Sequence, residues 1–205
     1  MNKRNALQLI AKSALLAGAT GILAACKPAA APKASFNAID LTGADYGKDF
    51  AMPDQNGQRR TVADFKGKVT LLFFGYTQCP DVCPPTLSVL AAVKQKLGAK
   101  GDQLQVIFVS VDPARDTPEI LKAYMANFDP SFLALRGSDD ELAAIAKEFK
   151  IYYKRVEGST PTSYTMDHTA GDYIFDPQGR LRLYSRYGTP VDTLAKDIEQ
   201  LIDGA

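Results

Sequence analysis

Three side chains in this sequence are suited to binding a soft metal or to exchanging electrons: Cys79, Cys83 and His168. Three residues separate the two cysteines, and His168 is the only histidine of the 205-residue chain. Two cysteines so close together can form a structural disulfide, a redox couple or a pair of metal ligands. The structural disulfide is the weakest of these alternatives, because closing so short a loop removes little entropy from the unfolded chain.

The two cysteines lie between a predicted strand and a predicted helix. Residues 69–74 form a continuous apolar run, which is typical of a strand that is buried on both faces. Two prolines at residues 84–85 suit the first turn of a helix, where a missing N–H group costs little. Cys79 and Cys83 are therefore expected at a strand end and a helix start, where α/β sheets place their chemistry. The helix dipole also favours thiolate over thiol there.

The histidine is expected at the same end of the sheet as the cysteines. Thioredoxin-type oxidoreductases use Cys-x-x-Cys and carry a proline in the loop that faces the cysteines. The corresponding loop here, residues 167–171, offers His168 and no proline. Two thiolates and one imidazole would suit trigonal copper(I), and imidazole suits copper in both oxidation states. Structural zinc sites need a fourth ligand. A histidine with a purely structural role is the alternative.

Two aspartates are predicted beside these ligands rather than bound to the metal. Asp112 ends the apolar strand of residues 104–111 and should face the cysteine loop, where it could orient His168 or exchange protons with a thiol. Its alternative role is that of a simple turn residue before a proline. Asp167 directly precedes the histidine and could hydrogen-bond nearby backbone.

The order of the predicted elements indicates a thioredoxin-like α/β fold. A β-α-β unit is followed by a terminal hairpin and helix, with an added N-terminal β-hairpin at residues 46–64 and extra structure inserted before the terminal hairpin. The other predicted elements are a short helical turn at 62–65, helices at 84–97, 117–127, 138–149 and 189–201, strands at 132–135, 172–175 and 180–187, and an extended segment at 151–156. Residues 158–166 are polar and turn-rich, so they predict a mobile loop.

Composition limits the class of protein. The chain carries 24 basic and 23 acidic side chains without a charged block, which argues against a nucleic-acid partner. A hydrophobic content of 46% and the chain length fit one globular domain with an ordinary core.

The N-terminal segment has the layout of a secretory signal. Lys3 and Arg4 precede an apolar, small-residue stretch at residues 7–25, which ends in Leu-Ala-Ala directly before Cys26. This ending resembles the bacterial lipobox, which implies that Cys26 is lipidated and anchors the mature protein. The predicted division is a signal peptide at 1–25, a lipid-anchored tether at 26–44 and the folded domain at 45–205. A plain signal peptide and a retained transmembrane helix are the alternatives. The folded domain then lies outside the cytoplasm, where disulfides can form.

Three motifs taken together resemble the Sco (SenC) family of copper proteins. They are Gly-Tyr-Thr-Gln-Cys-Pro-Asp-Val-Cys-Pro at 75–84, Ser-Val-Asp-Pro-Ala-Arg-Asp-Thr-Pro at 110–118, and Asp-His-Thr at 167–169. The resemblance runs from about residue 46 to the C-terminus. It implies a thioredoxin-like, membrane-tethered protein that binds one copper, as copper(I) or copper(II), through Cys79, Cys83 and His168. Asp112 is then expected to tune the metal or thiol chemistry.

The resemblance also implies a function at the periplasmic face of a membrane. Family members help to assemble the binuclear copper site of cytochrome c oxidase subunit II, and some reduce the cysteines of that site. The implied partners are that subunit, an upstream copper donor and a thiol reductant. Many members use a transmembrane helix, whereas this chain is expected to carry a lipid. The main alternative is a thiol–disulfide oxidoreductase that uses Cys79 and Cys83 as a redox pair without His168; a peroxide-reducing relative is a third.

Overall fold

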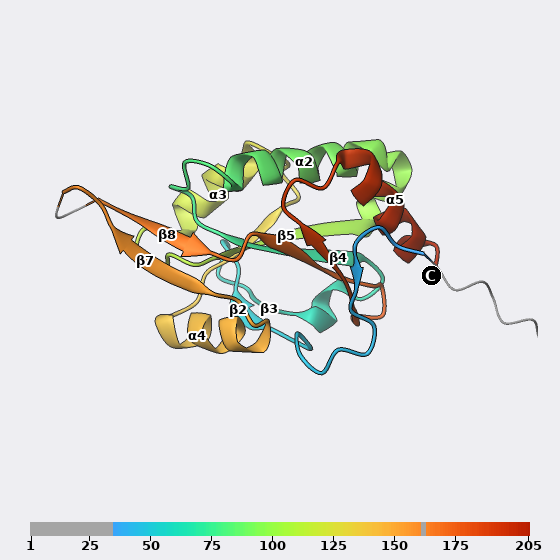
Figure 1. Ribbon diagram of the computed structural model, residues 1–205, viewed down its shortest axis with the longest axis horizontal. Helices are drawn as coiled ribbons and strands as arrows, with labels where there is room; N and C mark the ends of the chain where they lie inside the picture. The colour runs from blue at the N-terminus through green and yellow to red at the C-terminus, as the bar shows by residue number, and fades with distance from the viewer. Residues whose placement is uncertain (1–34, 161–162) are drawn as a thin grey trace, which may run out of the picture. The chain divides into compact units, whose positions relative to one another are not determined.

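A computed structural model describes residues 35–160 and 163–205 of the chain. The predicted signal peptide and Cys26 lie outside these residues. The described part folds around a mixed six-stranded sheet with the strand order β1-β10-β9-β4-β5-β6 (Figure 1). Its strands are β1 (Ile39–Asp40), β4 (Val69–Gly75), β5 (Leu104–Ser110), β6 (Leu133–Leu135), β9 (Gly171–Phe175) and β10 (Leu181–Arg186).

Two separate two-stranded sheets and six helical segments complete the part of the fold that the structure describes. The small sheets are β2 (Ala51–Pro53) with β3 (Arg59–Thr61) and β7 (Tyr153–Glu157) with β8 (Tyr164–His168). The helical segments are η1 (Val62–Phe65), α2 (Cys83–Lys96), η2 (Gly98–Gln103), α3 (Pro118–Ala126), α4 (Asp139–Glu148) and α5 (Val191–Ile202). No helix within the described residues is long and apolar enough to cross a membrane.

Strand β4 is the centre of the sheet. All seven of its residues are buried, as its continuous apolar run predicts. It pairs in parallel with β5 and antiparallel with β9. The helices α2, α3 and α5 cover one face of the sheet, whereas α4 and the β2–β3 hairpin lie on the other (Figure 1). Alternate β4 side chains follow this division, since Phe73 packs on Phe108 and Phe74 packs on Phe149, which caps α4.

The thioredoxin-like layout expected from the sequence is confirmed. The β4-α2-β5 unit, the terminal β9–β10 hairpin and α5 are all present, together with the N-terminal hairpin and the inserted elements. The helix starts also follow local sequence signals. Ser138 caps α4 reciprocally with Glu141, and the Thr117 side chain accepts a hydrogen bond from Ile120 N at the start of α3.

The prediction of a mobile loop at residues 158–166 is wrong for its second half. Tyr164–His168 form strand β8, and His168 pairs with Tyr153 at the end of the β7–β8 hairpin. Residues 161–162 lie outside the described part of the chain. The sheet also begins before residue 45, the expected start of the domain, because Ile39–Asp40 pair with β10.

The last residue of β4, Gly75, allows α2 to approach the sheet. A Cβ atom at Gly75 would lie 2.7 Å from Sγ of Cys83 and 2.8 Å from Cε2 of Phe108. Both distances are shorter than a van der Waals contact, so only glycine lets the first turn of α2 lie against the end of β4. This contact brings Cys83 into the layer between sheet and helix.

We predict that Gly75→Ala destabilises the protein by about 1–3 kcal/mol, as overpacking of a buried site does. In a Phe108→Leu background the cost should fall, because the shorter side chain relieves one of the two clashes. Urea unfolding of the two single variants and the double variant measures this coupling. Strictly additive costs would show that the contact does not limit the packing.

A buried carboxyl group interrupts the apolar layer beside α2. Asp172 of β9 is 5% exposed, and its Oδ1 has no hydrogen-bond partner in the described part of the chain. Burial raises the pKa of Asp172 to about 8. The folded chain therefore retains this proton over a pH range in which the unfolded chain, with an ordinary pKa of 3.8, has lost it.

We predict that Asp172→Asn is more stable than the wild type at neutral pH. Because the folded state binds the extra proton, wild-type stability falls as pH rises from about 4 to about 8, by up to about 1.4 kcal/mol per unit. The asparagine variant lacks this pH-dependent contribution to stability. The difference in unfolding free energy between the variant and the wild type should therefore widen across that range and level off above it. Urea unfolding at several pH values tests this; a difference that stays constant would contradict it.

Candidate metal centre

The two cysteines lie on either side of the step from loop to helix. After β4 ends, residues 76–82 form an irregular loop in which the backbone N–H of Cys79 donates to the carbonyl oxygen of Tyr76 at 3.2 Å. Cys83 is the first residue of α2. Both thiols are free; Cys83 is fully buried, and Cys79 is 7% exposed. The site therefore reaches the surface on the Cys79 side.

His168 approaches the cysteines from the end of β8. Its Nε2 lies 3.8 Å from Sγ of Cys83, and its Nδ1 lies 3.0 Å from the carbonyl oxygen of Thr169. A carbonyl oxygen can only accept a hydrogen bond, so Nδ1 carries the proton and Nε2 presents its lone pair to the sulfur atoms. The rings of Phe73 and Tyr76 contact the imidazole edge-on, with centroids at 6.3 and 5.9 Å. The ring is thus held in an orientation suited to metal binding.

The structure brings together the three residues that the sequence singles out. One ligand atom from each of Cys79, Cys83 and His168 lies within 4.8 Å of the others, and this is the one such cluster found among the described residues. With the bond lengths known for zinc, about 2.3 Å to sulfur and 2.1 Å to nitrogen, a trigonal ion would separate sulfur and nitrogen by roughly 3.8 Å. The observed separation of Cys83 Sγ and His168 Nε2 matches this value. The donor set fits a soft metal.

The two reduced cysteines share one proton. A hydrogen bond from Cys83 holds the pKa of Cys79 far below its usual value. The same hydrogen bond, together with burial, raises the pKa of Cys83. Cys79 is therefore the thiolate and Cys83 the thiol, which makes the more exposed sulfur the nucleophile.

The two predicted acidic neighbours lie in different surroundings. Asp112 is 3% exposed, and its carboxylate accepts hydrogen bonds from Arg115 and from the hydroxyl of Tyr164, the latter at 2.9 Å. It thus joins the loop after β5 to strand β8. Asp167 is exposed and precedes His168 on β8, so the alternation of a strand directs its side chain to the opposite face.

Asp116 holds the cysteine loop, a role that the sequence reasoning missed. It is fully buried and accepts hydrogen bonds from the hydroxyls of Thr77 and Ser110, each at 2.6 Å, and from the backbone N–H of Thr77. Burial raises its pKa despite these bonds. Asp116 lies in the motif at 110–118, but its distance of 37 residues from Cys79 gave no sign of the contact.

Arg115 and Tyr164 connect the cysteine loop to the β7–β8 hairpin, and neither was predicted. The guanidinium of Arg115 lies 3.5 Å from the ring centroid of Tyr164, and that of Arg155 lies 3.8 Å from it. Arg115 also donates to the side chain of Gln78 and to the carbonyl oxygen of Tyr164. This stack fixes the hairpin that carries His168 against the loop that carries Cys79.

Comparison with known proteins identifies relatives of this chain. The family model SCO1/SenC matches residues 40–203. The SCO2-like protein of Rickettsia felis is 30% identical over 203 residues, which cover 98% of this chain and 97% of that protein.

Solved structures show the same fold. Bradyrhizobium japonicum ScoI with copper bound is 40% identical, has a TM-score of 0.70, and the match covers 76% of this chain and 99% of that one. BsSco, a member of the Sco family of cytochrome c oxidase assembly proteins with an identified disulfide switch, is 25% identical with a TM-score of 0.64 over 83% of this chain and 99% of that one. By sequence and by fold, this chain belongs to the SCO1/SenC family.

Proposed function

We propose that this protein is a copper carrier that binds one copper ion through Cys79, Cys83 and His168. The observation that carries the proposal is the convergence of two free thiols and an imidazole nitrogen within 4.8 Å of one another. Thiolate and imidazole are the donors that copper(I) and copper(II) prefer. The copper-bound ScoI structure, which covers most of this chain, supports the choice of metal.

The arrangement suits transfer of the ion as well as binding. Cys83 is buried, but Cys79 reaches the surface and His168 is half-buried, so an incoming ligand can approach from their side. His168 belongs to a two-stranded hairpin outside the main sheet, and β7 of that hairpin is almost entirely exposed. Such an element is less stable than the central sheet, so it is the part of the fold whose displacement would open the site.

We propose that this protein acts in cytochrome c oxidase assembly and that the binuclear copper site of subunit II receives its copper. BsSco, which belongs to a family of cytochrome c oxidase assembly proteins, supports this assignment. An upstream copper donor must load the thiols, and a thiol reductant must keep them reduced. Oxidation to a disulfide removes two electrons and both thiolate ligands, so copper binding depends on redox state.

A second function, reduction of a target disulfide, is favoured by the thiolate character of Cys79. The Cys79 thiolate would attack one sulfur of the target, forming a mixed disulfide and releasing the other sulfur as a thiolate. Cys83 would then lose its proton and displace the target, which leaves as a dithiol while the chain keeps a disulfide between Cys79 and Cys83. This function needs both cysteines and not His168.

Replacing either cysteine by serine should remove most copper(I) affinity, at least about 100-fold, because a hydroxyl is a poor ligand for a soft ion. Competition with a chromophoric copper(I) chelator measures the affinity of the reduced protein. A full equivalent of copper retained by Cys83→Ser at wild-type affinity would contradict the proposed site.

Replacing His168 by alanine should weaken copper(II) binding most and abolish its thiolate-to-metal absorption band, since imidazole is the better ligand for that state. Thr165→Ala, at an exposed position on the same strand, is the matched control and should keep the wild-type spectrum. A spectrum unchanged in His168→Ala, with reductase activity intact, would favour the second function.

We also propose that Cys26 carries the lipid that anchors the domain at the periplasmic face of a membrane. Cys26→Ser should leave the N-terminus without a lipid. The mature, lipidated form should then disappear from the membrane fraction, and the protein should be found either as an uncleaved precursor or in the soluble fraction. Mass spectrometry of the N-terminal peptide tests this directly. An unmodified Cys26 in membrane-extracted protein would contradict the proposal.

A further inference from the structure

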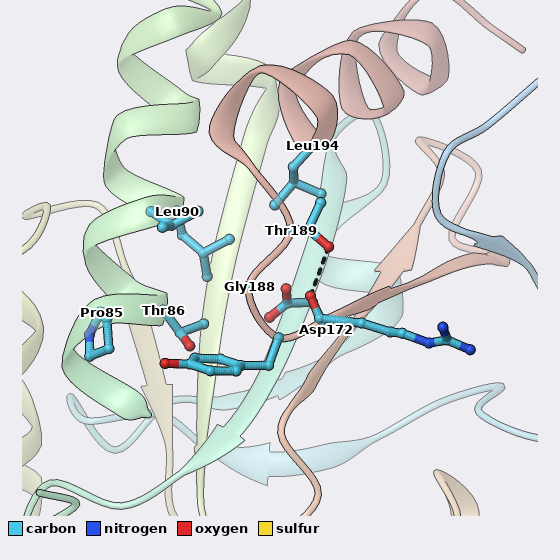
Figure 2. Close-up of a pocket in the computed structure, with 10 residues that line it drawn as sticks. Pro85, Thr86, Leu90, Asp172, Gly188, Thr189 and Leu194 are labelled. Atoms are coloured by element: carbon cyan, nitrogen blue, oxygen red, sulfur yellow. Dashed lines mark hydrogen bonds between the residues drawn. The ribbon is translucent and has the colours of Figure 1, made fainter. Parts of the chain in front are cut away.

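A small pocket lies apart from the candidate metal ligands, between α2, the turn after β10 and the start of α5 (Figure 2). Its volume is about 100 Å³, several times the space that one water molecule needs. None of the three candidate ligands lines it. Its walls are mainly apolar, formed by Pro85, Val89, Leu90, Tyr187 and Leu194.

The polar feature of this pocket is the carboxyl group of Asp172. Figure 2 shows the Asp172 side chain directed toward the space between α2 and the Gly188–Thr189 turn. Oδ1 of Asp172 has no hydrogen-bond partner among the described residues, and neither has Oγ of Ser185, its register neighbour on β10. A buried carboxyl without a partner is costly, so the group is suited to a ligand that supplies hydrogen-bond donors.

The two threonine hydroxyls that line the pocket, those of Thr86 and Thr189, act as acceptors toward it, whereas the side chains of Arg186 and Tyr187 belong to its exposed rim. The Thr86 hydroxyl donates its proton to the carbonyl oxygen of Val82 at 2.7 Å, and the Thr189 hydroxyl donates to that of Arg186 at 2.8 Å. Both oxygens keep lone pairs but have no proton left to give. An ammonium group has three donors and no acceptor, which complements such a lining. The Tyr187 ring adds a surface that attracts cations.

We propose that this pocket binds a primary ammonium group on a short aliphatic stem, with the Asp172 carboxylate as its counter-ion and the apolar walls around its methylene groups. The inference is independent of the proposed copper function, since it uses none of the metal ligands. A lysine side chain of a partner protein and a free small amine share this chemistry.

Proton release is the signature of this binding. Burial raises the pKa of Asp172 to about 8, so at neutral pH the free protein holds a proton that the ammonium must replace. Binding thus converts the carboxyl to a carboxylate, pairs it with the ammonium and releases one proton to solvent. The other titratable groups nearby are Arg186 and Tyr187, both exposed on the rim, and Tyr184, whose pKa is raised by burial and by the charge of Asp172.

Calorimetric titration of the full chain with n-butylammonium chloride tests the proposal. In two buffers of different ionisation enthalpy at pH 7, we expect release of close to one proton. The affinity for n-butylammonium should rise about tenfold per pH unit between pH 6 and 7 and level off above about pH 8. 1-Butanol, which has the same stem without the charge, should bind at least about tenfold more weakly.

Asp172→Asn should weaken n-butylammonium binding at pH 8.5 by about tenfold or more and abolish the proton release. The matched control, Asp192→Asn, removes a carboxylate at an exposed position on α5 and should bind as the wild type does. Equal affinity of wild type and Asp172→Asn, no binding to either, or equal affinity for 1-butanol would each overturn the proposal.

A measurement on the wild type alone keeps the test independent of any folding defect in the variant. The carboxyl carbon of Asp172, followed by nuclear magnetic resonance, should titrate near pH 8 in the free protein and at lower pH with saturating n-butylammonium. An unchanged midpoint would overturn the proposal. Nα-acetyl-lysine methylamide then separates the two sources: binding as tight as that of n-butylammonium assigns the pocket to a partner's lysine, and selective binding of n-butylammonium assigns it to a free amine.

Discussion

The contact between the Cys83 sulfur and the backbone of Gly75 determines where the reactive groups can meet. Because position 75 has no Cβ, the first turn of α2 lies directly on the end of β4, and Cys83 is buried between helix and sheet. A larger residue would lift the helix and move the sulfur away from His168, which approaches from a different strand. The site therefore depends on a missing side chain as much as on the three that could bind a metal.

Two carboxylates hold the irregular cysteine loop in place. Asp116 binds Thr77 from inside the protein, and Asp112 binds Arg115, which in turn reaches Gln78 and the β7–β8 hairpin. A loop without secondary structure of its own needs such bonds, because its backbone groups have few partners. The Asp116 bonds and the Arg115 contacts differ in how deeply they are buried. Asp116 acts on the buried side of the loop, whereas the Arg115 contacts lie near the surface, so the hairpin can separate while the loop stays in place.

The elements that bury the most apolar surface were the most predictable from the sequence. The apolar run of β4 and the prolines of α2 predict both elements and hence the position of the cysteines. Strand β8 was missed because none of its residues is fully buried, and because the Arg115 and Arg155 side chains that stack on Tyr164 come from other segments. The convergence of His168 with the cysteines follows from strand order. The bonds of Asp116 require the tertiary structure.

Two of the buried aspartates, Asp116 and Asp172, show how the same residue type serves different ends. Burial raises the pKa of both, but Asp116 has three donors around it and orders the loop, whereas Asp172 has an oxygen with no partner. The site of Asp172 on β9 faces an apolar layer and pairs with Phe73, so a hydrophobic residue there would satisfy the sheet at lower cost. The needs of folding alone therefore do not explain why an aspartate stands at position 172. The proposed occupant of the pocket does explain it, because its hydrogen-bond donors would satisfy the carboxyl group that the fold leaves unpaired.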